Sequence, residues 1–241
     1  MLAASSELPH GREIADAARL ATIELERRLD SGLALSPTYE LTDAMFEILT
    51  VCTGNICRSP LAAVVLRSRL ADQDVSVSSA GTHGLDAAPM TTQAVRLATD
   101  LGADPEDANT HRSRFLREQD LVSPDLIIAL SREHRRRILD MAPARMKQTF
   151  TAREFARLAE AVSDDDIRHA AEGLEAPAER MRAAVQRVSS MRGAARPPRD
   201  PRADDVVDPY RRSWATYQRS AAELVPAIDQ IVRVLHLVNS T

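Results

Sequence analysis

The sequence is poor in cysteine, lysine and aromatic residues, and its few cysteines and its net charge argue against some classes of protein. The 241 residues include two cysteines, five positions apart, which argues against a disulfide framework and for a reducing compartment. Aromatic residues make up 3% of the chain, and Lys147 is the one lysine among 31 basic residues. The formal charge of −4 gives no electrostatic reason to expect a nucleic-acid partner.

Long apolar runs are also missing. No stretch approaches the ~18 consecutive apolar residues that span a bilayer. Residues 1–9 have neither a basic segment nor a long apolar segment, so a secretory signal is not expected. No cluster of His, Cys or acidic residues has the spacing of a metal site. We therefore expect a soluble, cytoplasmic protein that binds no membrane and uses no metal or other cofactor.

One stretch, residues 46–60, combines signals for a strand, a loop and a helix with reactive side chains. Residues 46–51 are mostly apolar and partly β-branched, which is typical of a strand buried on both faces of a parallel sheet. Ser59, followed by a proline, then provides a capping hydroxyl for a helix over residues 61–70. We predict a short loop between strand and helix, with Cys52 at its start.

Cys52 and Arg58 stand six positions apart in this loop, which can direct successive backbone N–H groups at one tetrahedral anion. These groups and the guanidinium favour the thiolate of Cys52, the form that acts as a nucleophile. The guanidinium also binds two phosphate oxygens with its planar fork. A buried turn in which Cys52 is only a small apolar residue would explain neither the loop length nor Arg58. The predicted phosphate-binding loop therefore follows Cys52 and comprises Thr53, Gly54, Asn55, Ile56, Cys57, Arg58 and Ser59.

The motif V-C-T-G-N-I-C-R-S-P, residues 51–60, resembles the signature of the low-molecular-weight protein tyrosine phosphatases. The resemblance covers roughly residues 46–142 and 204–238. It implies metal-independent hydrolysis of phosphotyrosine in proteins, or of another phosphomonoester, through a cysteinyl-phosphate intermediate. Two other functions stay open. They are an arsenate reductase that uses an external small thiol and a non-catalytic phosphate-binding relative.

The leaving oxygen of a phenolic ester needs a proton, and the resemblance implies which residue supplies it. The family carries its general acid in a Val-x-Asp-Pro-type loop near the C-terminus, and residues 207–210, Val-Asp-Pro-Tyr, match that loop. Asp208 is therefore the predicted acid, although Asp-Pro is also a common start of a turn. Tyr210 is predicted to line the rim of the cleft and to stack on an aromatic substrate ring.

The resemblance further implies a set of residues that support the loop. Asn55 is expected to hold an unusual backbone conformation, and Ser59 to support the loop and the thiolate. Ser79 and His111 match positions that hydrogen-bond this asparagine in relatives. For His111 an ordinary surface or capping role is the alternative.

The second cysteine, Cys57, lies in the same loop as the predicted nucleophile. A low-pKa thiolate is oxidised readily, and a neighbouring thiol can trap the sulfenic acid as a disulfide before irreversible oxidation. We hypothesise that Cys52 and Cys57 form such a reversible disulfide. The alternative is that Cys57 only packs behind the loop.

Apolar strand-like segments alternate with helical segments after residue 46. This alternation predicts an α/β fold with a doubly wound, four-stranded parallel sheet and helices on both faces. The active loop then lies at the carboxyl end of the first strand. The other three strands are predicted over residues 75–79, 125–130 and 146–150, and helices over residues 93–101, 133–141 and onward from a capping box at 151–154.

Two segments are predicted as additions to a phosphatase-like domain of residues 46–241. Residues 1–45 form an N-terminal extension in which residues 11–29 have the apolar spacing of an amphipathic helix. This helix is expected to pack on the domain or on a second copy in a homo-oligomer, with a disordered tail as the alternative. A charged helical insert is predicted over about 151–203, before a final helix from about residue 214 to 238.

Overall fold

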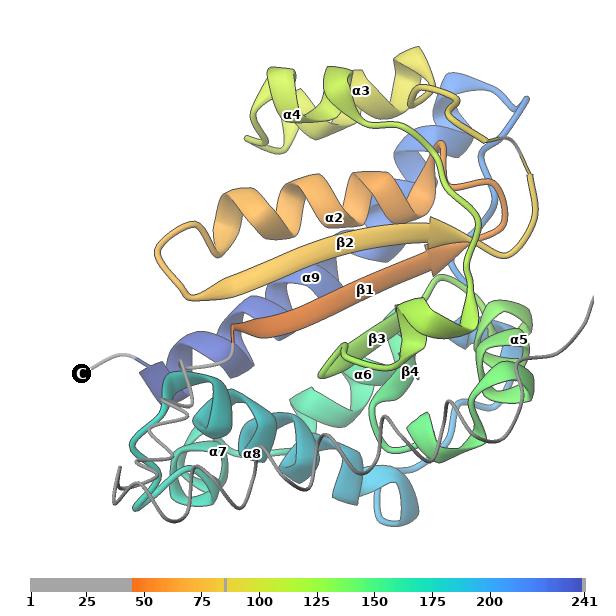
Figure 1. Ribbon diagram of the computed structural model, residues 1–241. Coiled ribbons are helices and arrows are strands. Elements are labelled where there is room, and N and C mark those ends of the chain that lie inside the picture. Colours follow the sequence, from red (N-terminus) through yellow and green to blue (C-terminus); the bar gives the residue numbers. More distant parts are fainter. Residues whose placement is uncertain (1–44, 85, 240–241) are drawn as a thin grey trace, which may run out of the picture. The chain divides into compact units, whose positions relative to one another are not determined.

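The computed structural model describes residues 45–84 and 86–239 (Figure 1). They belong to one structural unit, Asp43–Thr241. The predicted N-terminal helix and the oligomer expected through it lie outside the described residues. Within the described part of the chain, no helix is both long enough and apolar enough to cross a membrane.

A four-stranded parallel sheet lies at the centre of the described unit (Figure 1). Its strand order is β2-β1-β3-β4, so the direction of winding reverses on either side of β1. This arrangement confirms the predicted doubly wound sheet. In such sheets the loops after the strands at the reversal point diverge and leave a crevice for a ligand. The strands are β1 (Phe46–Cys52), β2 (Val75–Gly81), β3 (Leu126–Ala129) and β4 (Thr149–Thr151).

The fourth strand begins three residues later than the predicted start at residue 146. A 3₁₀ turn, η2 (Pro143–Arg145), precedes it, and the amides of Met146 and Gln148 continue the turn by donating to the carbonyls of Pro143 and Arg145. Those amides cannot then join the sheet. The apolar Met146 is 54% exposed. Its apolar character was therefore wrongly interpreted as the start of a buried strand.

Helices cover both faces of the sheet, as predicted. Alternate residues of β1 enter two separate clusters, because successive side chains of a strand point to opposite faces. Phe46 and Ile48 pack with the cluster that includes residues of α2 and α9, whereas Leu49 and Val51 pack with Ile138 of α5. The helices are α2 (Arg58–Arg69), α3 (Thr92–Asp100), α4 (Pro105–Thr110), α5 (Arg132–Met141), α6 (Ala152–Glu160), α7 (Asp164–Ala170), α8 (Pro177–Ser190) and α9 (Trp214–Asn239).

The helix starts agree with the sequence signals in one case and differ in another. The capping box before α6 is present, because Thr151 and Glu154 each accept a hydrogen bond from the other's backbone amide at 3.1 Å. Helix α2, however, starts after Cys57, and no side chain caps it. The prediction that Ser59 caps this helix was therefore wrong. Its hydroxyl is buried against the sulfur of Cys52 instead.

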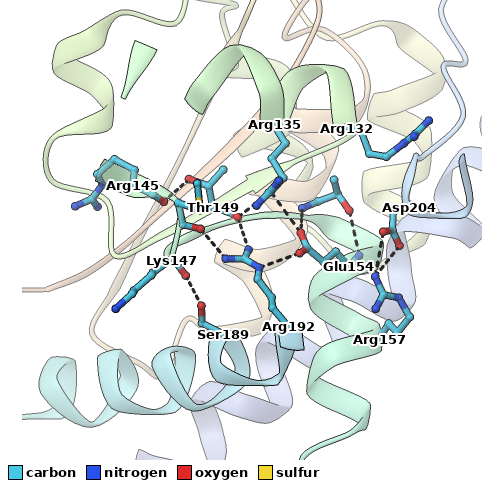
Figure 2. Close-up of polar contacts among 12 residues, drawn as sticks. Arg132, Arg135, Arg145, Lys147, Thr149, Glu154, Arg157, Ser189, Arg192 and Asp204 are labelled. Atoms are coloured by element: carbon cyan, nitrogen blue, oxygen red, sulfur yellow. Dashed lines mark hydrogen bonds and ion pairs between the residues drawn. The ribbon is translucent and has the colours of Figure 1, made fainter. Parts of the chain in front are cut away.

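The segment after α6 adds α7, α8 and the 3₁₀ turn η3 (Met191–Gly193), and Arg192 is one of the residues that fasten it to the edge of the sheet. The guanidinium of Arg192 lies 4.1 Å from the ring centroid of Phe150 and donates to Glu154 Oε1 at 2.9 Å. It also donates to the carbonyls of Met146 and Thr149, next to the edge strand β4 (Figure 2). Since an exposed sheet edge invites pairing with other chains, this contact protects β4.

Candidate active site

The loop between β1 and α2 is called the phosphate loop here, residues 52–59, and it is tightly wound. Asn55 adopts a left-handed backbone conformation with φ of 53°, which asparagine tolerates better than most residues. Two glycines let other backbone segments approach. A Cβ on Gly81 would lie 2.7 Å from the carbonyl oxygen of Thr53, and one on Gly84, whose φ is 117°, would lie 2.8 Å from Gly54 Cα. The loop conformation therefore depends on residues outside it.

The sulfur of Cys52 lies at the base of this loop, at the carboxyl end of β1. The Cys52 side chain is buried, and its Sγ accepts a hydrogen bond from the backbone amide of Asn55 at 3.3 Å. The hydroxyl of Ser59 lies 3.0 Å from the same sulfur. Both groups can donate to a thiolate, and hydrogen bonds to a charged form stabilise that form. The predicted role of Ser59 beside the thiolate fits this geometry.

Asn55 is the centre of the hydrogen bonds that hold the loop. Its Nδ2 donates to Ser79 Oγ at 2.8 Å and to Ser59 Oγ at 3.0 Å, and its Oδ1 accepts from the amide of Arg114. The Nε2 of His111 lies 2.8 Å from the backbone carbonyl of Asn55. Burial lowers the pKa of His111, which favours a neutral ring that donates one proton to this carbonyl. The structure thus places Ser79 and His111 in contact with Asn55.

Arg58, the first residue of α2, links the phosphate loop to the C-terminal part of the chain. The Arg58 side chain is buried. Its Nη2 lies 2.8 Å from Asp208 Oδ2, and its Nη1 donates to the carbonyl of Val206 at 3.1 Å. The Nε atom is buried and has no hydrogen-bond partner among the described residues. A buried N–H of a cation needs an acceptor, and a phosphate oxygen is one that the planar fork fits.

Asp208 belongs to the acid loop, residues 204–210, which is anchored on several helices. The amide of Arg132 at the start of α5 donates to Asp205 Oδ1 at 2.7 Å, and Arg157 of α6 pairs with Asp204 at 3.0 Å (Figure 2). Glu223 of α9 accepts from the amide of Val207 at 2.8 Å. Asp208 itself is half exposed, at 52% for its side chain. The anchors therefore fix the backbone and leave the carboxyl group accessible.

These groups surround one cavity of about 150 Å³. Tyr210, the residue predicted for the rim, is 39% exposed and is among the residues that line the cavity. Cys52, Arg58 and Asp208 therefore line the same cavity. The lining residues are Cys52, Thr53, Gly54, Ile56, Cys57, Arg58, Gly84, Asp208 and Tyr210.

The other cysteine of the loop points to different partners. Cys57 is buried, and its Sγ lies 3.5 Å from both Thr91 Oγ1 and the hydroxyl of Tyr217. Burial is the main cause that raises the pKa of the Cys57 thiol. Both cysteines are free thiols. The redox role of Cys57 stays a prediction, and in this state its sulfur packs toward α9.

His134, for which the sequence predicted no role, lies beside the loop. The Nε2 of this buried histidine lies 2.8 Å from Thr53 Oγ1, and its Nδ1 lies 2.9 Å from Ser131 Oγ. Burial and the nearby charge of Arg58 lower the pKa of His134 to about 3. One signal was available: His134 comes five residues after β3, the strand that pairs with β1.

A family model described as low molecular weight phosphotyrosine protein phosphatase matches residues 47–190, more than half of the sequence. The chain belongs to this family. The match ends before the acid loop and does not cover Asp208, so the role of Asp208 as the general acid stays a prediction.

Individual relatives cover parts of the chain. The low molecular weight protein-tyrosine-phosphatase Etp of Escherichia coli is 42% identical over 96 residues, which are 40% of this chain and 62% of that protein. A protein-arginine-phosphatase of Geobacillus stearothermophilus is 30% identical over 110 residues, 46% of this chain and 71% of the relative. The crystal structure of a low molecular weight protein tyrosine phosphatase from T. tengcongensis superposes with a TM-score of 0.53 at 28% identity, over 78% of this chain and 97% of that one.

Proposed function

We propose that this chain hydrolyses phosphotyrosine in proteins through a cysteinyl-phosphate intermediate and without a metal. The observation that carries the proposal is the shared cavity, in which a buried sulfur, an arginine with a free buried N–H and an accessible carboxyl group meet. The nucleophile, the anion-binding group and the acid of a phosphoryl transfer are then within reach of one phosphate.

In the first step the thiolate of Cys52 attacks phosphorus and forms an S–P bond as the P–O bond to the phenol breaks. The loop amides and the fork of Arg58 bind the equatorial oxygens, where charge is spread in the transition state. Phosphate oxygens then occupy donors of the guanidinium that otherwise face Asp208. Asp208, as the carboxylic acid, gives its proton to the leaving phenol oxygen.

In the second step water attacks the phosphorus of the cysteinyl phosphate. Asp208, now a carboxylate, accepts a proton from that water, so the S–P bond breaks and inorganic phosphate and the thiolate are released. The carboxyl group returns to its starting protonation state. One residue thus serves both steps, which requires that it stay near the phosphorus throughout. The anchors of the acid loop meet this requirement.

The walls of the cavity favour an aromatic substrate. Ile56 and Tyr210 line it, and Tyr210 offers a ring face on which a phenyl ring can stack. A second candidate is phosphoarginine, because one relative is a protein-arginine-phosphatase. A phosphoarginine side chain would bring a second cation close to the guanidinium of Arg58. Among the described residues that line the cavity, Asp208 is the one with a carboxyl group. The electrostatics therefore support phosphotyrosine over phosphoarginine.

Turnover of three substrates tests the proposal. A phosphotyrosine peptide, a phosphoarginine peptide and arsenate with a small thiol would be compared at equal concentrations in EDTA. We expect turnover of the phosphotyrosine peptide at the highest rate. Faster release of phosphate from the phosphoarginine peptide would show that phosphoarginine is the preferred substrate. Reduction of arsenate would show that the chain is an arsenate reductase. No turnover of any substrate would favour a non-catalytic binding protein.

The matched control is Cys52→Ser. We expect this variant to lose turnover by more than about 1,000-fold and to keep its affinity for phosphate, because the loop amides and Arg58 survive the change. Phosphate binding would be measured by calorimetry in parallel with the rates. Substantial turnover in the variant would refute the covalent mechanism.

A further inference from the structure

A continuous line of polar contacts runs from α5 to the phosphate loop across the carboxyl ends of β3 and β1. It begins at Ser131, whose Oγ accepts the backbone amide of His134 at 3.3 Å and lies 2.9 Å from its Nδ1. It continues from Nε2 to Thr53 Oγ1 at 2.8 Å, and Thr53 Oγ1 accepts a longer bond from Arg58 Nη2 at 3.4 Å. No step of the hydrolysis described above uses this histidine.

We propose that His134 is a positioning residue that fixes the Thr53 hydroxyl, and through it the guanidinium of Arg58, for binding the phosphate group. This inference rests on the proposed function. Thr53 lines the cavity, whereas His134 does not, so His134 acts through Thr53. Side chains that hold a binding group in its productive orientation commonly contribute to catalysis in this way.

The hydrogen atoms can be assigned along the line. The Ser131 hydroxyl already accepts the amide of His134, so its own hydrogen is available for Nδ1. The ring proton then resides on Nε2 and is donated to Thr53 Oγ1, which also accepts from Arg58. The hydrogen of Thr53 remains for an acceptor in the cavity. A phosphate oxygen there would receive a hydrogen bond that is fixed in direction by the histidine.

The surroundings keep this ring neutral. Its side chain is 4% exposed, and the guanidinium of Arg58 and the carboxylate of Asp205 are the charged groups that lie near it. A charged imidazole would also place a second cation beside the guanidinium, which costs free energy in a buried site. His134 is therefore expected to stay in one protonation state over the working pH range, as a group that only positions its neighbour should.

The first test is a double-mutant cycle of His134→Leu and Thr53→Val. Each variant should lose about tenfold in kcat/KM, and the double variant should lose no more than Thr53→Val alone, because both changes interrupt the same line of contacts. The loss should be equal for a phosphotyrosine peptide and for an ester with an acidic phenol, since phosphate binding rather than proton donation is impaired. Losses that multiply in the double variant would overturn the proposal.

Further variants separate positioning from simple support of the fold. His134→Gln places an amide N–H near the position of Nε2 and should recover most of the activity that His134→Leu loses. His169→Leu, a change at an exposed histidine of α7, is the matched control and should have wild-type rates. Melting temperatures would be measured for all variants. A loss of rate that follows the melting temperature and is not rescued by glutamine would assign His134 to stability alone.

Two further measurements make the inference independent of turnover. Calorimetry with inorganic phosphate should show about tenfold weaker binding for Thr53→Val and His134→Leu, even in an enzyme with no measurable turnover of phosphotyrosine. Imidazole ¹⁵N spectra should show His134 as the neutral Nε2–H form from pH 5 to 8. Titration of its signal in that range, or unchanged phosphate affinity in both variants, would contradict the proposal.

Discussion

The phosphate loop and the acid loop meet at Arg58, yet they are built in different ways. The phosphate loop is held largely by buried groups, such as Asn55 and Ser59, that lie within it or on the neighbouring strand. The acid loop holds a half-exposed carboxyl group by ion pairs and amide contacts to three helices. Both loops depend on residues outside them, but the phosphate loop is held by hydrogen bonds to a buried asparagine at its centre, and the acid loop by contacts with helices around a half-exposed carboxyl group.

The largest effect that separates the two loops is expected from Asp208→Asn. The phosphate loop is unchanged, so attack by Cys52 proceeds, but the leaving oxygen receives no proton. Hydrolysis of a phosphotyrosine peptide should slow by about 100-fold to 1,000-fold, within the range of general acid catalysis. An ester of a very acidic phenol should slow far less at the first step, because its oxygen leaves as the anion.

Burst kinetics measure the first step separately for the two substrates. A variant that slows both bursts to the same extent would mean that Asp208 acts on the guanidinium of Arg58 rather than on the leaving group. The 2.8 Å contact between Asp208 and Arg58 is the structural basis for this alternative role of Asp208.

A smaller effect is expected when the acid loop is detached from its support. Asp205→Ala removes the acceptor for the first amide of α5 and the pairing with the Arg132 side chain. Asp208 should then lose its fixed position, and phosphotyrosine hydrolysis should fall by roughly threefold to tenfold. Asp205→Asn keeps an acceptor for the amide and should fall less.

The matched control for the anchor is Asp166→Ala, which breaks an ion pair with Arg187 in the segment after α6. It should leave the rates unchanged, because surface ion pairs contribute little and this one does not contact the acid loop. Equal activity of Asp205→Ala and Asp166→Ala, at equal melting temperature, would show that the anchor does not position Asp208.

The contrast between the loops also explains what the sequence could predict. The strand, the loop and the helix around Cys52 and Arg58 could be predicted from one short motif, because their signals are contiguous in the sequence. The anchors Asp205 and Glu223 could not be found, because each joins residues that only the folded sheet brings together. The cap assigned to Ser59 was wrong for the opposite reason. The local pattern predicted a helix cap, but in the folded chain the hydroxyl of Ser59 contacts the sulfur of Cys52 instead.

A more modest effect concerns pH. Burial lowers the pKa of His134 to about 3 and also lowers that of His111, while unfolded histidines titrate near pH 6.5. The unfolded chain therefore binds more protons below pH 6.5, and stability falls as the pH falls from there toward 3. The slope for one such group approaches about 1.4 kcal/mol per pH unit.

Urea unfolding between pH 4.5 and 7.5 measures this slope. His134→Gln should flatten it by close to one proton, and His111→Gln by less. If the pH dependence of stability is the same in His134→Gln as in the wild type, other groups cause the acid sensitivity. That result would contradict the assignment of a neutral His134.

The smallest effect is expected at Cys57, which shares the phosphate loop but points toward Thr91 and Tyr217. Peroxide converts the Cys52 thiolate to a sulfenic acid, and the Cys57 thiol can then displace water from it to form a disulfide. The reaction should be slow, because burial raises the pKa of the Cys57 thiol and the side chain must leave its two hydroxyl partners. We predict that oxidised wild type loses two hydrogens in mass and recovers activity with a reductant. Cys57→Ala should recover less, and equal recovery without a change in wild-type mass would limit Cys57 to packing.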